Sequence, residues 1–184
     1  LNGSDTADQL NGLEGNDTLN GLAGDDVLYG DAGDDLVTGG DGADEIHGGA
    51  GADDIDAGEG NDSIYIDAIG DVAAGEQING GSGIDTLLTD RQGGLPDDSF
   101  FDISAATLTG IERLDSSAGE AFGLTGAQFA GVTGIGGRFY LTDAGAVSLN
   151  GISAFASVSL SLHAGGNQLD LTGFTPSGFI IVGG

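Results

Sequence analysis

Residues 39–56 read GGDGADEIHGGAGADDID, which is a nine-residue unit written twice. The same unit runs without a gap in seven copies from Gly3 to Tyr65, and an eighth copy spans Gly80 to Leu88. A random acidic composition does not keep such a register, so the period of nine is the feature that determines the fold.

Three positions of the unit carry the pattern. Position eight is a branched aliphatic residue in every copy, and position four is glycine in all copies except the first, which has Thr6. Those glycines are Gly15, Gly24, Gly33, Gly42, Gly51, Gly60 and Gly83. Position six is always aspartate, and its members are Asp8, Asp17, Asp26, Asp35, Asp44, Asp53, Asp62 and Asp85.

The unit predicts a glycine-rich turn followed by a short strand. Glycine adopts positive φ and lets backbone carbonyls approach a ligand, so the first six residues can fold back on themselves. In the last three residues, the aliphatic side chain faces inward and its two neighbours face outward. We therefore expect Gln9, Asn11, Glu45 and His47 on the surface, and two units to form one 18-residue coil of a flattened solenoid.

Such a coil stacks the aspartates into two columns. One column holds Asp8, Asp26, Asp44 and Asp62, and the other holds Asp17, Asp35 and Asp53. Carboxylates at the strand spacing of about 4.8 Å repel one another unless a hard cation lies between them. Calcium is favoured over magnesium because it accepts six to eight oxygen ligands in loose geometry, whereas zinc and copper prefer histidine or cysteine. The columns predict about five well-formed calcium sites, with weaker ones at the ends.

These residues resemble the repeats-in-toxin (RTX) family, whose nonapeptide is G-G-x-G-x-D-x-U-x with U a large aliphatic residue. The resemblance covers residues 3–65 and 80–88. Ser4, Leu13, Leu22 and Asp31 depart from it at position two, and Ala57 departs at position one. The resemblance implies Ca²⁺ between turns, held by the aspartates and by backbone oxygens of positions two and four. This adds Gly40 and Gly49 to the expected metal ligands.

The chain divides into two halves of different chemistry, with 24 of its 30 acidic residues in residues 1–98. We expect an all-β protein with a calcium-binding β-roll over 1–98, interrupted by an insertion at 66–79. A wider, calcium-poor β-solenoid should follow over 99–184, with coils of about 22 residues. Apolar triplets with three-residue spacing begin there at Leu108, Phe129 and Ile152, and Phe155 is the middle residue of the third triplet. We expect these side chains, together with later apolar residues such as Leu171 and Ile180, to stack inside the coils. A leucine-rich repeat has a similar period and is the alternative for this half.

Composition excludes several function classes. A net charge of −27 with three arginines and no lysine argues against nucleic acid or an anionic membrane surface as a partner. No apolar run approaches the roughly 18 residues that span a bilayer, and no cysteine is present. The chain also lacks HExxH, G-x-S-x-G and P-loop motifs, and we interpret His47 and His163 as surface residues. We expect no catalytic residues and no enzyme activity.

Two functions fit this pattern. The first is a calcium-binding extracellular structural module of a type I-secreted bacterial surface protein, in an S-layer or an adhesin, that folds and self-assembles on calcium into a homo-oligomer or lattice. The second is the calcium-binding accessory region of a secreted protease, lipase or alginate epimerase. Type I secretion and an extracellular or cell-surface location are implied by the family resemblance in both cases.

Overall fold

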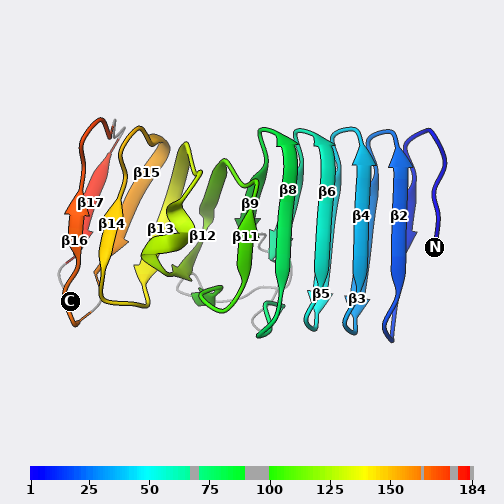
Figure 1. Ribbon diagram of the computed structural model, residues 1–184, viewed down its shortest axis with the longest axis horizontal. Helices are drawn as coiled ribbons and strands as arrows, with labels where there is room; N and C mark the ends of the chain where they lie inside the picture. The colour runs from blue at the N-terminus through cyan, green and yellow to red at the C-terminus, as the bar shows by residue number, and fades with distance from the viewer. Residues whose placement is uncertain (67–70, 90–99, 163, 175–177, 183–184) are drawn as a thin grey trace.

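The computed structural model describes residues 1–66, 71–89, 100–162, 164–174 and 178–182. The chain winds as a β-solenoid whose strands lie side by side along the long axis, with the N-terminus at one end and the C-terminus at the other (Figure 1). All strand pairs in these ranges are parallel. The all-β solenoid expected from the repeats is confirmed.

A ten-stranded sheet runs the length of the molecule. In spatial order it contains β1 (Gln9–Asn11), β3 (Val27–Ala32), β5 (Glu45–Ala50), β7 (Ser63–Ile66), β9 (Thr86–Thr89), β12 (Arg113–Leu124), β13 (Gly134–Leu141), β15 (Ser153–Ser161) and β17 (Phe179–Val182). The tenth strand, β10 (Phe100–Asp102), pairs with the second part of β12. One sheet therefore joins the acidic repeats to the second half of the chain.

Two smaller sheets form the other side of the solenoid. The five-stranded sheet contains β2 (Thr18–Ala23), β4 (Leu36–Asp41), β6 (Asp54–Gly60), β8 (Gln77–Gly83) and β11 (Thr107–Thr109). The two-stranded sheet contains β14 (Ala146–Ser148) and β16 (Gln168–Asp170). A short 3-10 helix, η1 (Gly126–Phe129), lies between β12 and β13 in the chain, and the described residues contain no α-helix.

The strands are longer than the three residues predicted. A six-residue strand such as β2 covers positions seven to nine of one unit and positions one to three of the next, so the turn is confined to positions four to six. Strands also occupy both ends of the expected insertion at 66–79, since Ile66 lies in β7 and Gln77 begins β8. Backbone pairing needs only an extended chain, and glycine at positions one and two does not prevent it.

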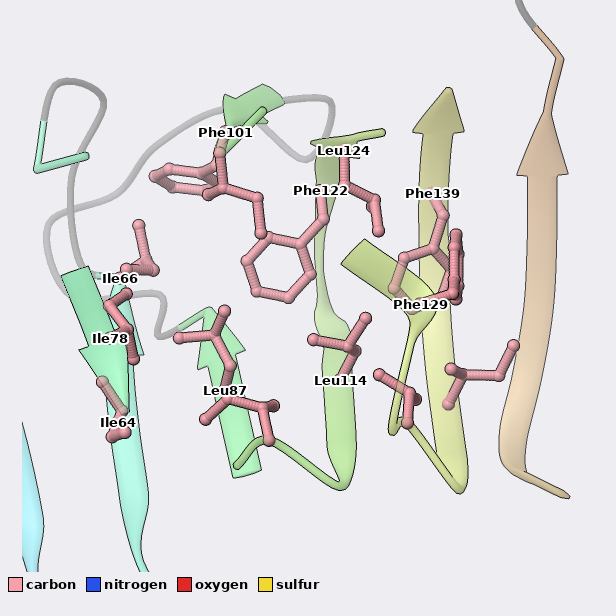
Figure 2. Close-up of a cluster of buried hydrophobic side chains, with 14 of the residues drawn as sticks. Ile64, Ile66, Ile78, Leu87, Phe101, Leu114, Phe122, Leu124, Phe129 and Phe139 are labelled. Carbon is pink, nitrogen blue, oxygen red and sulfur yellow. The ribbon is translucent and has the colours of Figure 1, made fainter. Parts of the chain in front are cut away.

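Position eight supplies the core of the repeats, as predicted. Its residues from Leu19 to Leu87 are at most 1% exposed, and Ile78 of β8 occupies the equivalent place. Figure 2 shows this aliphatic column, including Ile64 and Leu87, continuing into the phenylalanines of the second half. Phe122 and Phe139 are buried there with ring centroids 6.3 Å apart.

The second half continues the solenoid, so the leucine-rich repeat alternative is wrong. Ile111, Leu114, Val132 and Ile135 are buried, as the apolar triplets predicted. Leu171, expected inside, is instead 39% exposed. The side chains of Phe155 and Ile180 and the predicted boundary between residues 98 and 99 lie outside the described part of the chain.

His47 is not a surface residue. Its ring stacks between Tyr29 and Tyr65, with both centroid distances 4.5 Å, and only 3% of the residue is exposed. The position does face outward, but parallel in-register pairing places the ninth residues of β3, β5 and β7 directly against one another, and the two tyrosines cover the imidazole. His163 lies outside the described residues.

Candidate metal centre

The position-six aspartates form two hydrogen-bonded columns along the edges of the solenoid. In each step, the backbone N–H of one aspartate donates to a carboxylate oxygen of the aspartate in the next coil. Asp26 N donates to Asp44 Oδ1 at 2.9 Å, and Asp35 N donates to Asp53 Oδ1 at 2.9 Å. The same contact runs from Asp8 to Asp26 and from Asp44 to Asp62. Because the coils pair in register 18 residues apart, each acidic side chain lies directly against the backbone of the preceding coil.

The second oxygen of each inner carboxylate has no partner. Six aspartates are at most 3% exposed, and within the described residues each Oδ2 is buried without a hydrogen bond; they are Asp26, Asp35, Asp44, Asp53, Asp62 and Asp85. A buried carboxylate left in this state costs free energy because it has lost its water. Six such oxygens at equivalent places indicate a shared ligand rather than six independent packing faults.

Backbone carbonyls converge on the same oxygens. A Cβ added at Gly12 would lie 2.7 Å from Gly30 O and 3.0 Å from Asp17 Oδ2. At Gly21, the corresponding point crowds against Gly39 O and Asp26 Oδ2. Because glycine at position one has no side chain, it leaves an open space beside two oxygens: a carbonyl oxygen of the next coil and the position-six carboxylate oxygen of the same unit. We call this space a cradle.

The turns need glycine at position four for two reasons. Gly33 has a φ of 143°, and a Cβ there would lie 2.5 Å from the carbonyl carbon of Gly15. Position two also has positive φ in every unit but the first, and three of the four departures from the family pattern keep this geometry. Leu13, Leu22 and Asp31 have φ values of 80°, 82° and 71°, a left-handed conformation that costs a non-glycine residue about 1–2 kcal/mol.

Burial and the neighbouring acids in each column disfavour the ionised form of the position-six carboxylates. The pKa values of Asp53 and Asp62 are raised to about 6, mainly by burial; a backbone hydrogen bond acts in the opposite direction, and neighbouring carboxylates add to the rise. Burial likewise raises the pKa values of Asp35, Asp44 and Asp85. A cation between the turns would remove this penalty, because it favours the ionised form.

Two glutamates complete the columns, and the repeat pattern did not identify them. Glu76, which is 2% exposed, accepts a hydrogen bond from Asp53 N at 3.2 Å, and Glu112 accepts one from Asp85 N at 3.0 Å. Burial raises the pKa of Glu76 to about 8. Each glutamate stands two residues before a buried aliphatic, Ile78 or Leu114, as the aspartates do, and that spacing was the available signal. With them, one column has five gaps between successive acids and the other has three.

These residues fit calcium. Within the described residues, no three His, Cys, Asp or Glu side chains gather at one point, so each gap offers at most two carboxylates and leaves its other ligand positions to backbone carbonyls and water. Mixed carboxylate and carbonyl oxygen is the donor set that calcium accepts. The structure brings the predicted aspartates together beside glycine carbonyls. The role of each predicted aspartate and glycine as a ligand stays a prediction.

The family comparison agrees with the geometry. The model of the RTX calcium-binding nonapeptide repeat, which spans four copies, matches twice, at residues 2–37 and 29–64. Residues 2–64 belong to the RTX calcium-binding repeats. RTX repeats are calcium-binding modules typical of type I secreted proteins, and they are typically non-catalytic. No match was found among curated proteins. Within the described residues, no helix has the length and apolar character needed to span a membrane.

Proposed function

We propose that this chain is a calcium-dependent structural module of a type I-secreted bacterial surface protein, in an S-layer or an adhesin. The observation that carries the proposal is the set of six buried carboxylate oxygens that have no hydrogen-bond partner in the part of the chain that the structure describes. Calcium would bind them together with the position-one carbonyls that face the same cradles. Residues 1–98 would form the calcium-binding unit, and residues 99–184 would form a calcium-poor extension of it.

Calcium would act as the condition for folding. Without it, burial and mutual repulsion of the carboxylates disfavour the stacked coils, and the chain stays unfolded where calcium is scarce. Binding to the folded state alone adds about 2.7 kcal/mol per site when the ion is at 100 times its Kd. Six to eight sites would then stabilise the RTX coils by well over 10 kcal/mol, which is as large as the stability of an ordinary domain.

A structural role is favoured by the continuity of the solenoid. The ten-stranded sheet passes from the RTX repeats into the second half, so that both halves form one rod (Figure 1). Eight calcium ions would reduce the net charge from −27 to about −11. The remaining exposed acids leave a surface that calcium could bridge to a neighbouring copy.

The folding claim is tested by far-UV circular dichroism. Chelation with EDTA should abolish most of the β-sheet signal, and calcium in excess should restore it, whereas magnesium at the same concentration should not. A spectrum that is unchanged in EDTA would overturn the proposal.

The assembly claim needs its own experiment. Calcium-dependent sheets or filaments in electron micrographs would support a surface lattice, and monomeric sedimentation in millimolar calcium would count against it. A catalytic motif elsewhere in the full-length gene would instead indicate the accessory region of a secreted enzyme.

A further inference from the structure

The junction between β9 and β12 repeats the cradle geometry outside the matched family region. A Cβ at Gly80 would lie 2.8 Å from Asp85 Oδ2 and would also collide with Gly110 O. This is the arrangement seen at Gly12, with Gly110 supplying the carbonyl of the next coil from 30 residues away in the chain. Asp85 is fully buried, and its Oδ2 has no partner among the described residues.

Glu112 provides the second carboxylate of this junction. Its Oε2 accepts a hydrogen bond from Asp85 N at 3.0 Å, as an aspartate Oδ1 does in the RTX coils. The turn from Gly110 to Glu112 contains three residues, whereas the turn from Gly80 to Asp85 contains six. The extra methylene of glutamate compensates for the shorter turn, because it lets the carboxylate reach the same backbone N–H.

The backbone of Glu112 also joins the two halves of the solenoid. Its N–H donates to Asp85 O at 3.1 Å, and its carbonyl accepts from Thr133 N at 2.7 Å and from Gly134 N at 3.0 Å. An ion held by Asp85 and Glu112 would therefore fix the last repeat turn to β12 and, through the Glu112 carbonyl, to the start of β13.

We propose that a calcium ion binds between the Gly80–Asp85 turn and the Gly110–Glu112 turn, held by the carboxylates of Asp85 and Glu112 and by Gly110 O. The site ties the calcium-poor half to the RTX coils and makes the order of β12 and β13 depend on calcium. This inference rests on the proposed function, because it requires calcium in the neighbouring RTX cradles, but it concerns a site outside residues 2–64.

The test compares Glu112→Gln with Glu59→Gln in the full chain. Glutamine keeps an oxygen that can accept from Asp85 N but removes the charge, and Glu59 is an exposed acid of β6 that serves as the matched control. Equilibrium dialysis should show one calcium fewer in E112Q than in the wild-type chain, and no change in E59Q. Hydrogen exchange of β12 and β13 should become faster in E112Q by up to about 100-fold at calcium 100 times its Kd, while β2 to β5 keep their protection.

An E112Q chain with the wild-type calcium count and wild-type protection overturns the inference. If E112Q unfolds throughout, the test uses a calcium titration of the wild-type chain. The site requires that hydrogen exchange of β12 and β13 slows as calcium is added, and exchange rates that do not depend on calcium refute it. A wild-type chain that binds no calcium at all refutes the proposed function instead, so the two failures are distinguishable.

Discussion

The substitution Asp44→Asn should change the stability of the chain in opposite directions with and without calcium. Asp44 is 2% exposed, its Oδ1 accepts from Asp26 N, and its Oδ2 is buried with no hydrogen bond to any described residue. Asparagine keeps the first contact, and its amide can donate to Ala57 O, which faces the same cradle. Without calcium, the variant removes an unpaired buried charge and should be more stable by about 1–3 kcal/mol. With calcium at 100 times its Kd, each lost site should cost about 2.7 kcal/mol, and the loss should be at least that large because Asp44 borders two gaps of its column.

The assay follows the far-UV circular dichroism signal under two conditions. In calcium, urea unfolding should show a lower midpoint for D44N; in EDTA, folding induced by trimethylamine N-oxide should show a lower osmolyte midpoint. Asp34→Asn is the matched control, since the exposed Asp34 Oδ1 accepts from Ala52 N and Asn61 makes the equivalent contact. Destabilisation of D44N by the same amount in both conditions would refute the reasoning, because it would show that Asp44 acts only through packing.

Three further predictions concern pH, turns and the aromatic stack. In EDTA, with enough sucrose added to keep the chain folded, the fold should be most stable near pH 4 and lose stability up to about pH 8. The pKa values of Asp53 and Glu76 are about 6 and 8, above their unfolded values, so both groups hold their protons more tightly in the folded state. Melting temperatures that rise with pH would contradict this. Gly33→Ala should lower the free energy of unfolding in calcium by about 1–3 kcal/mol more than Gly15→Ala. Of these two glycines, only Gly33 lies against the backbone of an earlier turn. Equal urea midpoints for the two variants would argue against this close contact between turns. His47→Ala should lower the free energy of unfolding, measured by thermal unfolding, by about 1–3 kcal/mol. His47→Phe should lower it by less than about 1 kcal/mol, because phenylalanine keeps both ring contacts. Equal losses in the two variants would exclude stacking as the cause.

The repeats could be predicted well because their rules are local. Leu28 is buried because the middle side chain of a short strand faces one way, and Asp26 and Asp44 stack because two nine-residue units close one coil. Glu76 and Glu112 were missed because each follows an interruption of the period, and only strand pairing shows which coil each one joins. The burial of His47 was missed for a similar reason, since it depends on neighbours 18 residues away on either side.

The sequence by itself determined the coil, its aliphatic core and the columns of acids, because a strict period of nine specifies which side chains face inward and which lie at the turns. Only the tertiary structure decided where the columns end. Parallel pairing continues through segments of any length, so the pairing of β9 with β12 brings Glu112 against Asp85 across 27 residues. The structure also showed that one carboxylate oxygen in each inner turn accepts from a backbone N–H of the preceding coil, while the other has no hydrogen bond within the described residues. This distinction depends on contacts between coils.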